Sequence, residues 1–170
     1  MAQLPQEFLT RMQEMLGDEF DAFLTSYDAP RTAGLRVNTK KCRTEDFPPL
    51  VPGTWKKIPW IPNGYFVPDG MRMGQSPLYA AGVFYLQEPS AMTPASRLPI
   101  EPGERVLDLC AAPGGKATEL NARLAGTGLL VANDISNARA KALLRNLELF
   151  GSENVLVTNE TPAGLANVFP

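Results

Sequence analysis

Apolar residues recur every three to four positions near the start of the chain, which predicts two short amphipathic helices. The first spans residues 5–16, where Pro5 suits the first helical turn and Gly17 ends the pattern. Asp18 caps the second helix, which we expect to run to Tyr27. The apolar faces comprise Phe8, Leu9, Met12, Met15 and Leu16 in the first helix, and Phe20, Phe23, Leu24 and Tyr27 in the second.

The next stretch predicts short strands and loops. Residues 35–38 alternate between apolar and polar side chains, which is typical of a strand. Residues 44–77 are rich in Pro and Gly, so we expect loops and short extended segments there, with no boundaries that the pattern can place.

From residue 88 onwards, short apolar runs alternate with helical patterns. After a short helix that opens at Pro89, the order is β-α-β-α-β, which is half of a doubly wound parallel sheet. This change of pattern at residue 88 predicts two domains: a smaller α+β domain over residues 1–87, and an α/β domain over residues 88–170. The expected strands are 105–109, 129–132 and 155–158, and the expected helices run from 116 to 125 and, after Ser136 or Asn137, to Phe150.

Composition fits a soluble globular protein, since 44% of the 170 residues are hydrophobic and 20% are charged. No apolar run approaches the roughly 18 residues of a membrane span, and the N-terminus has neither the basic start nor the apolar run of a signal peptide. We therefore expect a cytoplasmic protein with no membrane partner.

The chain has two cysteines, Cys42 and Cys110, and no histidine. A structural zinc site usually needs four Cys or His ligands, so we expect no metal. A Ser-His-Asp or Cys-His catalytic site is impossible within these residues. A single cysteine pair in a chain of this kind is more often two free thiols than a disulfide.

Charge is distributed unevenly along the N-terminal third. Residues 1–30 carry one basic and six acidic side chains, whereas residues 31–60 carry seven basic and two acidic ones, together with Trp55 and Trp60. Basic and aromatic side chains together can follow a phosphate backbone and stack on bases. The same residues can equally form a solvated face with two tryptophans in the core, and both interpretations stay open.

Small and polar residues follow all three predicted strands of the second domain, at the edge where such sheets bind ligands. Asp134 follows the second strand and is suited to hold the two hydroxyl groups of a ribose. Asn159 and Glu160 follow the third strand, near the expected place of an adenine. The loop after the first strand consists of Cys110, Ala111, Ala112, Pro113, Gly114, Gly115 and Lys116, whose small side chains allow a ligand close to the backbone.

These features favour an adenosine-containing cofactor. The dinucleotide fingerprint G-x-G-x-x-G is absent, and a phosphate-binding P-loop would need Gly at position 110 and Ser or Thr at 117, where the chain has Cys110 and Ala117. A loop without a pyrophosphate cradle favours S-adenosyl-L-methionine, which has no phosphate. A nicotinamide cofactor, or a sheet that binds nothing there, remains an alternative.

Several motifs resemble a known family. Residues 108–116 (Asp-Leu-Cys-Ala-Ala-Pro-Gly-Gly-Lys) resemble the first cofactor motif of the Fmu/Sun-type RNA cytosine-C5 methyltransferases, and residues 87–92 (Gln-Glu-Pro-Ser-Ala-Met) resemble a second hallmark. Residues 35–39 resemble the N-terminal strand of that family. The opening, with Leu4, Pro5 and Phe8, is most similar to the bacterial ribosomal RNA branch called YebU or RsmF. The resemblance covers nearly the whole chain.

The resemblance implies a Rossmann-like methyltransferase fold, incomplete in this chain, with the smaller N-terminal domain facing RNA. The loop at residues 110–116 would surround the methionine and ribose of S-adenosylmethionine, and Asp134 would bind the ribose hydroxyls. Asn159 or Glu160 would lie beside the adenine. Arg139 would support the site, although a solvated helical arginine is an equal alternative.

The resemblance also implies a reaction. In the family, a cysteine attacks C6 of a cytosine, which makes C5 nucleophilic towards the sulfonium methyl group, and a second cysteine helps to release the product. Their Asp-Ala-Pro-Cys and Thr-Cys motifs are absent from this sequence. Cys110 lies in the cofactor loop, and Cys42 has no base nearby in the sequence.

We therefore expect the nucleophile beyond Pro170, and we expect these residues alone to be inactive and marginally stable. The methylated RNA would be ribosomal RNA. The alternative is a non-catalytic module that binds the cofactor or RNA.

Overall fold

The computed structural model describes residues 4–29 and 32–169 and divides the chain into two compact units, Met1–Arg31 and Thr32–Pro170. The predicted boundary at residue 88 falls inside the second unit, between its two sheets. The division into domains at residues 87 and 88 therefore stays a prediction. Within the described part, no helix is long and apolar enough to span a bilayer.

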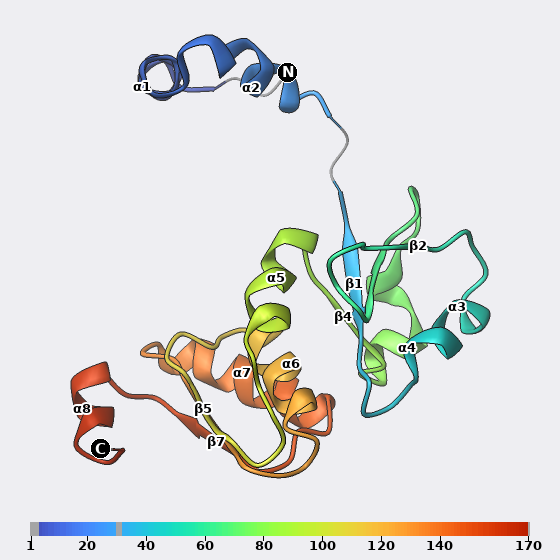
Figure 1. Ribbon diagram of the computed structural model, residues 1–170, viewed down its shortest axis with the longest axis vertical. Helices are drawn as coiled ribbons and strands as arrows, with labels where there is room; N and C mark the ends of the chain where they lie inside the picture. Colours follow the sequence, from blue (N-terminus) through green and yellow to red (C-terminus); the bar gives the residue numbers. More distant parts are fainter. Residues whose placement is uncertain (1–3, 30–31, 170) are drawn as a thin grey trace. The chain divides into compact units, whose positions relative to one another are not determined.

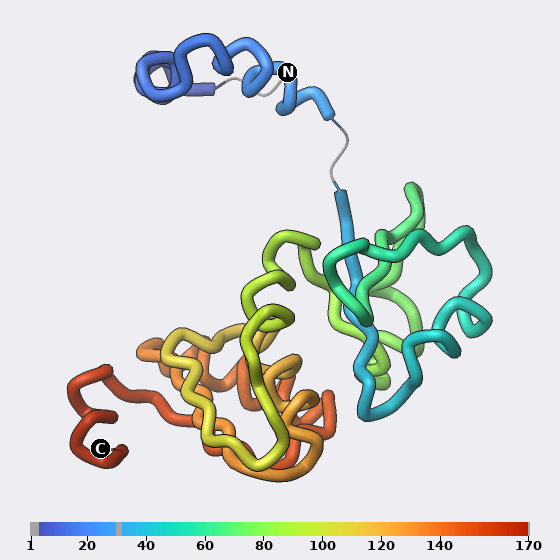
Figure 2. Tube along the Cα trace, in the orientation of Figure 1, coloured from blue at the N-terminus to red at the C-terminus, as the bar shows by residue number. Residues whose placement is uncertain are grey.

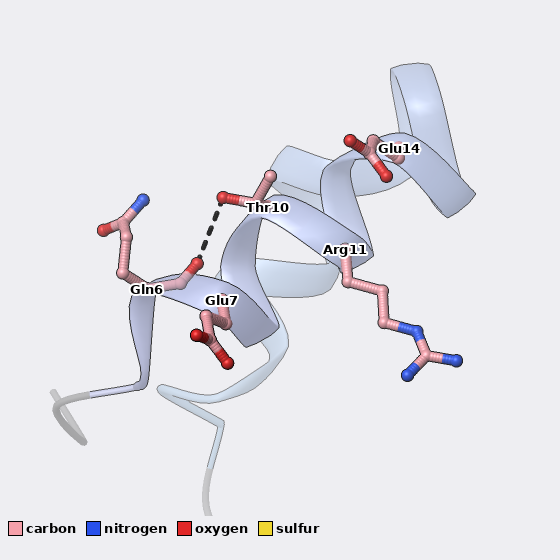
Figure 3. Close-up of a pocket in the computed structure, with 5 residues that line it drawn as sticks. All are labelled: Gln6, Glu7, Thr10, Arg11 and Glu14. Atoms are coloured by element: carbon pink, nitrogen blue, oxygen red, sulfur yellow. Dashed lines mark hydrogen bonds between the residues drawn. The ribbon is translucent and has the colours of Figure 1, made fainter.

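The first unit contains the two predicted helices, α1 (Gln6–Leu16) and α2 (Phe20–Ser26), joined by a 3-10 turn. An aromatic pair joins the two helices, because the ring centroids of Phe8 and Phe23 lie 6.1 Å apart. Phe23 also lies 5.3 Å from Tyr27, the residue that follows α2. Figure 3 shows polar side chains around a shallow hollow on α1, where the Thr10 hydroxyl donates a hydrogen bond to the Gln6 carbonyl at 3.2 Å. No residue of either helix is buried.

The second unit begins with an antiparallel sheet in the order β2-β3-β1-β4 (Figure 1). Leu35 in β1 pairs with Tyr65 in β3 and Leu86 in β4, which places β1 in the middle of the sheet. The strand expected at residues 35–38 is confirmed. The strands are β1 (Gly34–Val37), β2 (Lys56–Lys57), β3 (Gly64–Phe66) and β4 (Phe84–Leu86), with short helices α3 (Phe47–Leu50) and α4 (Pro77–Ala80).

The core of this sheet is aromatic and aliphatic. Phe47 is fully buried and lies against Trp55, Tyr65 and Phe84, at 5.1 to 5.9 Å between ring centroids. Helical and extended segments alternate every few residues between positions 44 and 77, which explains why the sequence pattern placed no boundaries there.

A parallel sheet in the order β5-β6-β7 follows, which confirms the predicted β-α-β-α-β arrangement. Helices α6 and α7 cover one of its faces through a core that includes Leu120, Leu130 and Leu143. In Figures 1 and 2 these helices lie along the sheet, and α5 precedes β5. The elements are α5 (Pro89–Arg97), β5 (Arg105–Asp108), α6 (Gly115–Arg123), β6 (Leu129–Asn133), α7 (Asn137–Leu149), β7 (Val155–Thr158) and α8 (Pro162–Ala166).

Candidate functional site

The carboxyl ends of β5, β6 and β7 bring the candidate residues to one edge of the sheet. Asp108 at the end of β5 is in register with Ala132, and Asn133 at the end of β6 is in register with Thr158. The loop at residues 110–116, Asp134, and the pair Asn159 and Glu160 therefore follow neighbouring strand ends. This is the position at which open α/β sheets bind ligands.

The loop after β5 consists mainly of small residues because other side chains pack closely against it. Gly114 has φ +115°, in the left-handed region, and begins α6 as its N-cap. A Cβ atom there would lie 3.3 Å from the Leu143 side chain, and one at Gly115 would lie 3.0 Å from the Gln87 amide nitrogen. The motif that contains Gln87 therefore packs directly on the loop. The N-terminus of α6 has no side-chain cap, which leaves its first N–H groups for a ligand.

Two carboxylates at this edge each have one oxygen that is not hydrogen-bonded within the described part of the chain. Asp134 is 2% exposed, and its Oδ1 accepts a hydrogen bond from the Ser136 N–H at 3.0 Å. Asp108 is half-buried, and its Oδ1 accepts one from the Cys110 N–H at 3.3 Å. The second oxygen of each is buried and accepts no hydrogen bond from the described residues. A buried carboxylate oxygen without a donor is costly, so both oxygens are suited to a ligand with hydroxyl or cationic groups.

Burial shifts the ionisation of one of these carboxylates. The pKa of Asp108 is raised above its ordinary value, mainly because burial disfavours the charged form, and the nearby charge of Asp134 adds to the rise. A hydrogen bond from Cys110 and the charge of Lys116 oppose this shift. A bound cation would relieve the same penalty.

Arg139 joins Asp134 to the loop. Its Nη2 lies 3.3 Å from Asp134 Oδ2 as an ion pair, and the same nitrogen donates a hydrogen bond to the Ala112 carbonyl at 2.8 Å. The side chain is 59% exposed, so this contact is partly screened by solvent. The position favours the supporting role over a purely solvated arginine, and that role stays a prediction.

Asn159 and Glu160 are both exposed and both engaged locally. The Asn159 side-chain amide donates to the Asp134 carbonyl at 2.7 Å. The Glu160 carboxylate accepts from the Thr161 N–H at 2.9 Å. The Asn159 side chain is therefore hydrogen-bonded to Asp134, the residue that follows β6. The contact of either side chain with an adenine stays a prediction.

The two cysteines differ in position and environment. Cys110 is exposed in the loop, and Cys42 is half-buried. Burial raises the pKa of the Cys42 thiol, with the negative charges of Asp46 and Glu45 acting in the same direction. A thiol with a raised pKa is a weaker nucleophile at neutral pH, which agrees with the expectation that Cys42 has no catalytic role.

Four residues at this edge were given no role by the sequence analysis, although Asp108 belongs to the first cofactor motif. Asp108 carries a signal of the same kind as Asp134, a carboxylate that ends an apolar strand. Asn146, Thr118 and Arg36 contact the backbone of the loop, and nothing in their local sequence marks them. Among the described residues, no group of three or more His, Cys, Asp or Glu side chains is arranged to hold a metal ion.

Most of the described basic side chains of residues 31–60 bind other groups of the chain. Lys40 pairs with Glu153 at 3.3 Å, Lys41 donates to the Ala81 and Leu149 carbonyls, and Arg43 pairs with Asp46. Trp55 belongs to the core and donates to the Val51 carbonyl at 2.9 Å. In contrast, the exposed side chains of Lys56 and Lys57 in β2 form no hydrogen bond or ion pair with the described residues, and Trp60 is 39% exposed. Arg31 lies outside the described residues.

Two family models match the chain. The model described as the N-terminal domain of 16S rRNA methyltransferase RsmF matches residues 4–89, and the model described as 16S rRNA methyltransferase RsmB/F matches residues 95–164. Both agree with the resemblance seen in the sequence motifs.

Curated relatives extend the match along the chain. Proteins called ribosomal RNA small subunit methyltransferase F are 38% identical over 166 residues in Enterobacter sp. (strain 638) and 36% identical over 166 residues in Escherichia coli (strain K12). Each match covers 91% of this chain, and the chain spans 35% of the length of each relative.

Solved structures share the fold. A methyltransferase homologue from Pyrococcus horikoshii is 26% identical, with a TM-score of 0.86, over 98% of this chain and 56% of its own. NSun6 from the same organism, solved with SFG, is 16% identical, with a TM-score of 0.81, over 96% of this chain and 67% of its own. These likenesses confirm the predicted Rossmann-like α/β fold.

Proposed function

We propose, from the premise that this chain belongs to the family of the 16S rRNA methyltransferase RsmF, that it forms the S-adenosylmethionine-binding part of an enzyme that methylates cytosine C5 in RNA. The RNA would be ribosomal, as the names of the relatives suggest. The nucleophilic cysteine would come from outside these 170 residues.

The observation that carries this proposal is a pair of buried carboxylate oxygens, one on Asp108 and one on Asp134, that accept no hydrogen bond from the described residues. The Asp134 oxygen is ion-paired with the exposed Arg139 at 3.3 Å. S-adenosylmethionine offers two ribose hydroxyls as donors and an ammonium group as a cation, which suit two such oxygens. Asp134 would accept hydrogen bonds from the ribose hydroxyls, and Asp108 would hold the ammonium group.

The cofactor loop, defined as residues 110–116, would contribute its shape and its backbone. Its small residues admit the ligand, and the uncapped N-terminus of α6 favours a carboxylate such as that of the methionine part. Asn159 or Glu160 would lie at the adenine, and Arg139 would hold Asp134 and the loop together.

When bound, S-adenosylmethionine supplies an electrophilic methyl group on a sulfonium centre. The residues of this chain bind and orient that cofactor. Its positive charge near Asp108 would favour the ionised carboxylate, which burial alone disfavours. Binding would thus be stronger when Asp108 is ionised.

The proposed RNA contact lies on β2, an outer strand of the antiparallel sheet, where Lys56 and Lys57 are exposed. Trp60 follows them, and its ring lies 6.3 Å from that of Phe66 in an edge-to-face arrangement. Exposed lysines beside an exposed indole can bind phosphates and stack on a base. We place the protein in the cytoplasm on the same basis, since ribosomal RNA is its proposed substrate.

The decisive experiment uses the whole natural protein that carries these residues. Calorimetric titration should show one S-adenosylmethionine per chain, and labelled cofactor should transfer methyl groups to C5 of a cytosine in ribosomal RNA. Cofactor binding without transfer would instead support the non-catalytic module. Binding of a nicotinamide cofactor in competition would overturn the proposed ligand.

The RNA contact has its own test. Lys56→Glu combined with Lys57→Glu should weaken binding to ribosomal RNA and reduce the salt slope by about one per lost phosphate contact. Arg105→Glu is the matched control, because Arg105 is exposed at the amino end of β5, away from the ligand edge. An equal effect of both changes would speak against a contact at β2.

A further inference from the structure

Four consecutive backbone carbonyls of the cofactor loop are each held by a side chain. The Ala112 carbonyl accepts from Arg139 at 2.8 Å and the Pro113 carbonyl from Asn146 at 2.7 Å. The Gly114 carbonyl accepts from the Thr118 hydroxyl at 2.8 Å, and the Gly115 carbonyl from Arg36 Nη2 at 2.8 Å. Four of the seven carbonyls of residues 110–116 are thus bonded to side chains, which restricts this part of the loop to one conformation.

Fixing these carbonyls also fixes the N–H groups that face a ligand. In a planar trans peptide, the N–H points opposite to the carbonyl of the preceding residue. The side chains that bind the carbonyls of residues 113–115, together with the first turn of α6, therefore also set the directions of the N–H groups of Gly114, Gly115 and Lys116. Donors that are oriented before binding lose less entropy when the ligand arrives.

Three of the four side chains come from α6 and α7, whereas Arg36 comes from β1 of the antiparallel sheet. Its guanidinium also donates to the Thr118 hydroxyl at 2.7 Å and pairs with Glu119. Thr118 in turn holds Gly114, so Arg36 acts on two adjacent carbonyls, one directly and one through Thr118.

The Arg36–Glu119 pair is buried, with 2% and 9% of the two side chains exposed. Asn63, in the turn before β3, donates to the same Glu119 oxygen at 3.1 Å. Burying an ion pair gives little net stability compared with apolar residues of the same size. Arg36 donates directly to the Gly115 carbonyl and reaches the Gly114 carbonyl through Thr118. These contacts with the loop explain why the buried pair is charged, which its contribution to stability does not.

We propose that Arg36 is a positioning residue for cofactor binding, through which the antiparallel sheet holds the cofactor loop in its binding conformation. The proposal rests on the proposed function for its ligand, S-adenosylmethionine. Its structural part, the hold of Arg36 on the loop, does not depend on the ligand. Under this proposal, the affinity for the cofactor depends on the antiparallel sheet as well as on the parallel sheet of the Thr32–Pro170 unit.

The test must separate positioning from folding, because Arg36→Met alone leaves Glu119 buried without its partner. The double variant Arg36→Met/Glu119→Met removes both charges at similar volume and should remain folded. Thr118→Val keeps the ion pair and removes the hydroxyl that accepts from Arg36 and donates to the Gly114 carbonyl. The control is Arg123→Met, since Arg123 also lies on α6 but donates to the Ala95 and Ile100 carbonyls, away from the loop.

In the whole natural protein, we expect the double variant to weaken the Kd for S-adenosylmethionine by about tenfold or more and Thr118→Val by a smaller factor. The control should stay within about twofold of the unchanged protein, and RNA affinity should not change in any variant. A double variant that melts as the unchanged protein does and binds the cofactor equally well would overturn the proposal.

Hydrogen exchange without ligand gives a second, independent measurement. The Thr118 N–H donates to the Gly114 carbonyl at 2.9 Å, and the Leu124 N–H donates to Leu120 at the other end of α6 at 3.1 Å. In the double variant, exchange should accelerate at Thr118 and not at Leu124. Equal rates at Thr118 in variant and unchanged protein overturn the proposal even if the protein binds the cofactor. Faster exchange at Thr118 in a protein that binds no S-adenosylmethionine supports the hold on the loop and refutes the proposed function instead.

Discussion

At the scale of single residues, the candidate site contains carboxylates whose burial costs free energy. Asp134 is almost completely buried, and burial raises the pKa of Asp108, yet neither carboxylate has both oxygens bonded. Apolar or amide side chains would fit these strand ends at lower cost. Buried carboxylates with an oxygen that is not hydrogen-bonded, at the ligand edge of a parallel sheet, are typical of a binding site.

Replacing Asp134 with Ala should weaken S-adenosylmethionine binding by about 1–3 kcal/mol, because a hydrogen bond to a charged acceptor is lost. Calorimetric titration of the whole protein measures the change. Asp69→Ala is the matched control, since Asp69 is an exposed loop residue. Unchanged affinity of the Asp134 variant would refute its role.

Replacing Asp108 with Asn should raise the melting temperature at pH 7 by a few degrees while weakening cofactor binding. The pKa of Asp108 is raised in the folded protein. As the pH rises, the unfolded chain therefore loses this proton first, and the free energy of unfolding falls between the ordinary carboxyl pKa of about 3.9 and the raised value. Above that window the penalty is constant, and the Asn variant avoids it.

Thermal unfolding across pH values checks this prediction. The difference between the Asn variant and the unchanged protein should be largest near neutrality and should shrink below the ordinary carboxyl pKa, where Asp108 is protonated in both states. A difference that is independent of pH would show that the gain has another origin.

At the scale of elements, α7 supports the cofactor loop along much of its length. Arg139, Leu143 and Asn146, spaced three to four residues apart, form one face of the helix and contact the loop or lie within van der Waals reach of Gly114. The C-terminal end of α7 is fixed by Lys41, which donates to the Leu149 carbonyl at 2.6 Å. Strand β1 and the turn that follows it thus anchor both helices that carry the loop.

Gly114→Ala and Gly70→Ala should have similar effects on stability and different effects on binding. Both glycines have φ in the left-handed region, so each alanine should cost about 1–2 kcal/mol of unfolding free energy. A Cβ at Gly70 meets nothing within 4 Å, whereas one at Gly114 meets Leu143 behind the loop. Only Gly114→Ala should weaken cofactor binding in a titration; equal losses in both variants would contradict this.

At the scale of the whole molecule, the parallel sheet has one covered and one open face. On the face opposite to α6 and α7, Leu107 and Leu156 are each 48% exposed, and both are in register with Val131 between them. Within the residues that the structure describes, β5 and β7 each pair on one side only. Parallel sheets are normally covered on both faces, so this row of side chains is a surface prone to association.

These 170 residues, expressed by themselves, should therefore associate at micromolar concentration. Leu107→Glu combined with Leu156→Glu should reduce the association without changing secondary structure, because it charges the open row. Light scattering and circular dichroism measure the two properties. A sharp, reversible melt of the unchanged 170 residues as a monomer would contradict the prediction.

The sequence by itself determined the elements and most of the candidate site. Periodicity gave the paired helices at the start and the β-α-β-α-β order, because these depend on local apolar spacing. The cofactor loop and Asp134 were predictable, because strand ends and small-residue loops are visible in one dimension. The stretch at residues 44–77 was not, since its short turns and strands are fixed by packing around Phe47.

The tertiary structure alone decided which side chains serve the loop. Arg36 and Gly115 are 79 residues apart in the sequence, and Asn146 and Pro113 are 33 apart, so no local pattern links them. It also divided the basic stretch: Lys40, Lys41 and Arg43 bind other groups of the chain, whereas the side chains of Lys56 and Lys57 bind none among the described residues. Charge and periodicity indicate which interactions a side chain can form, and only the folded chain determines its partners.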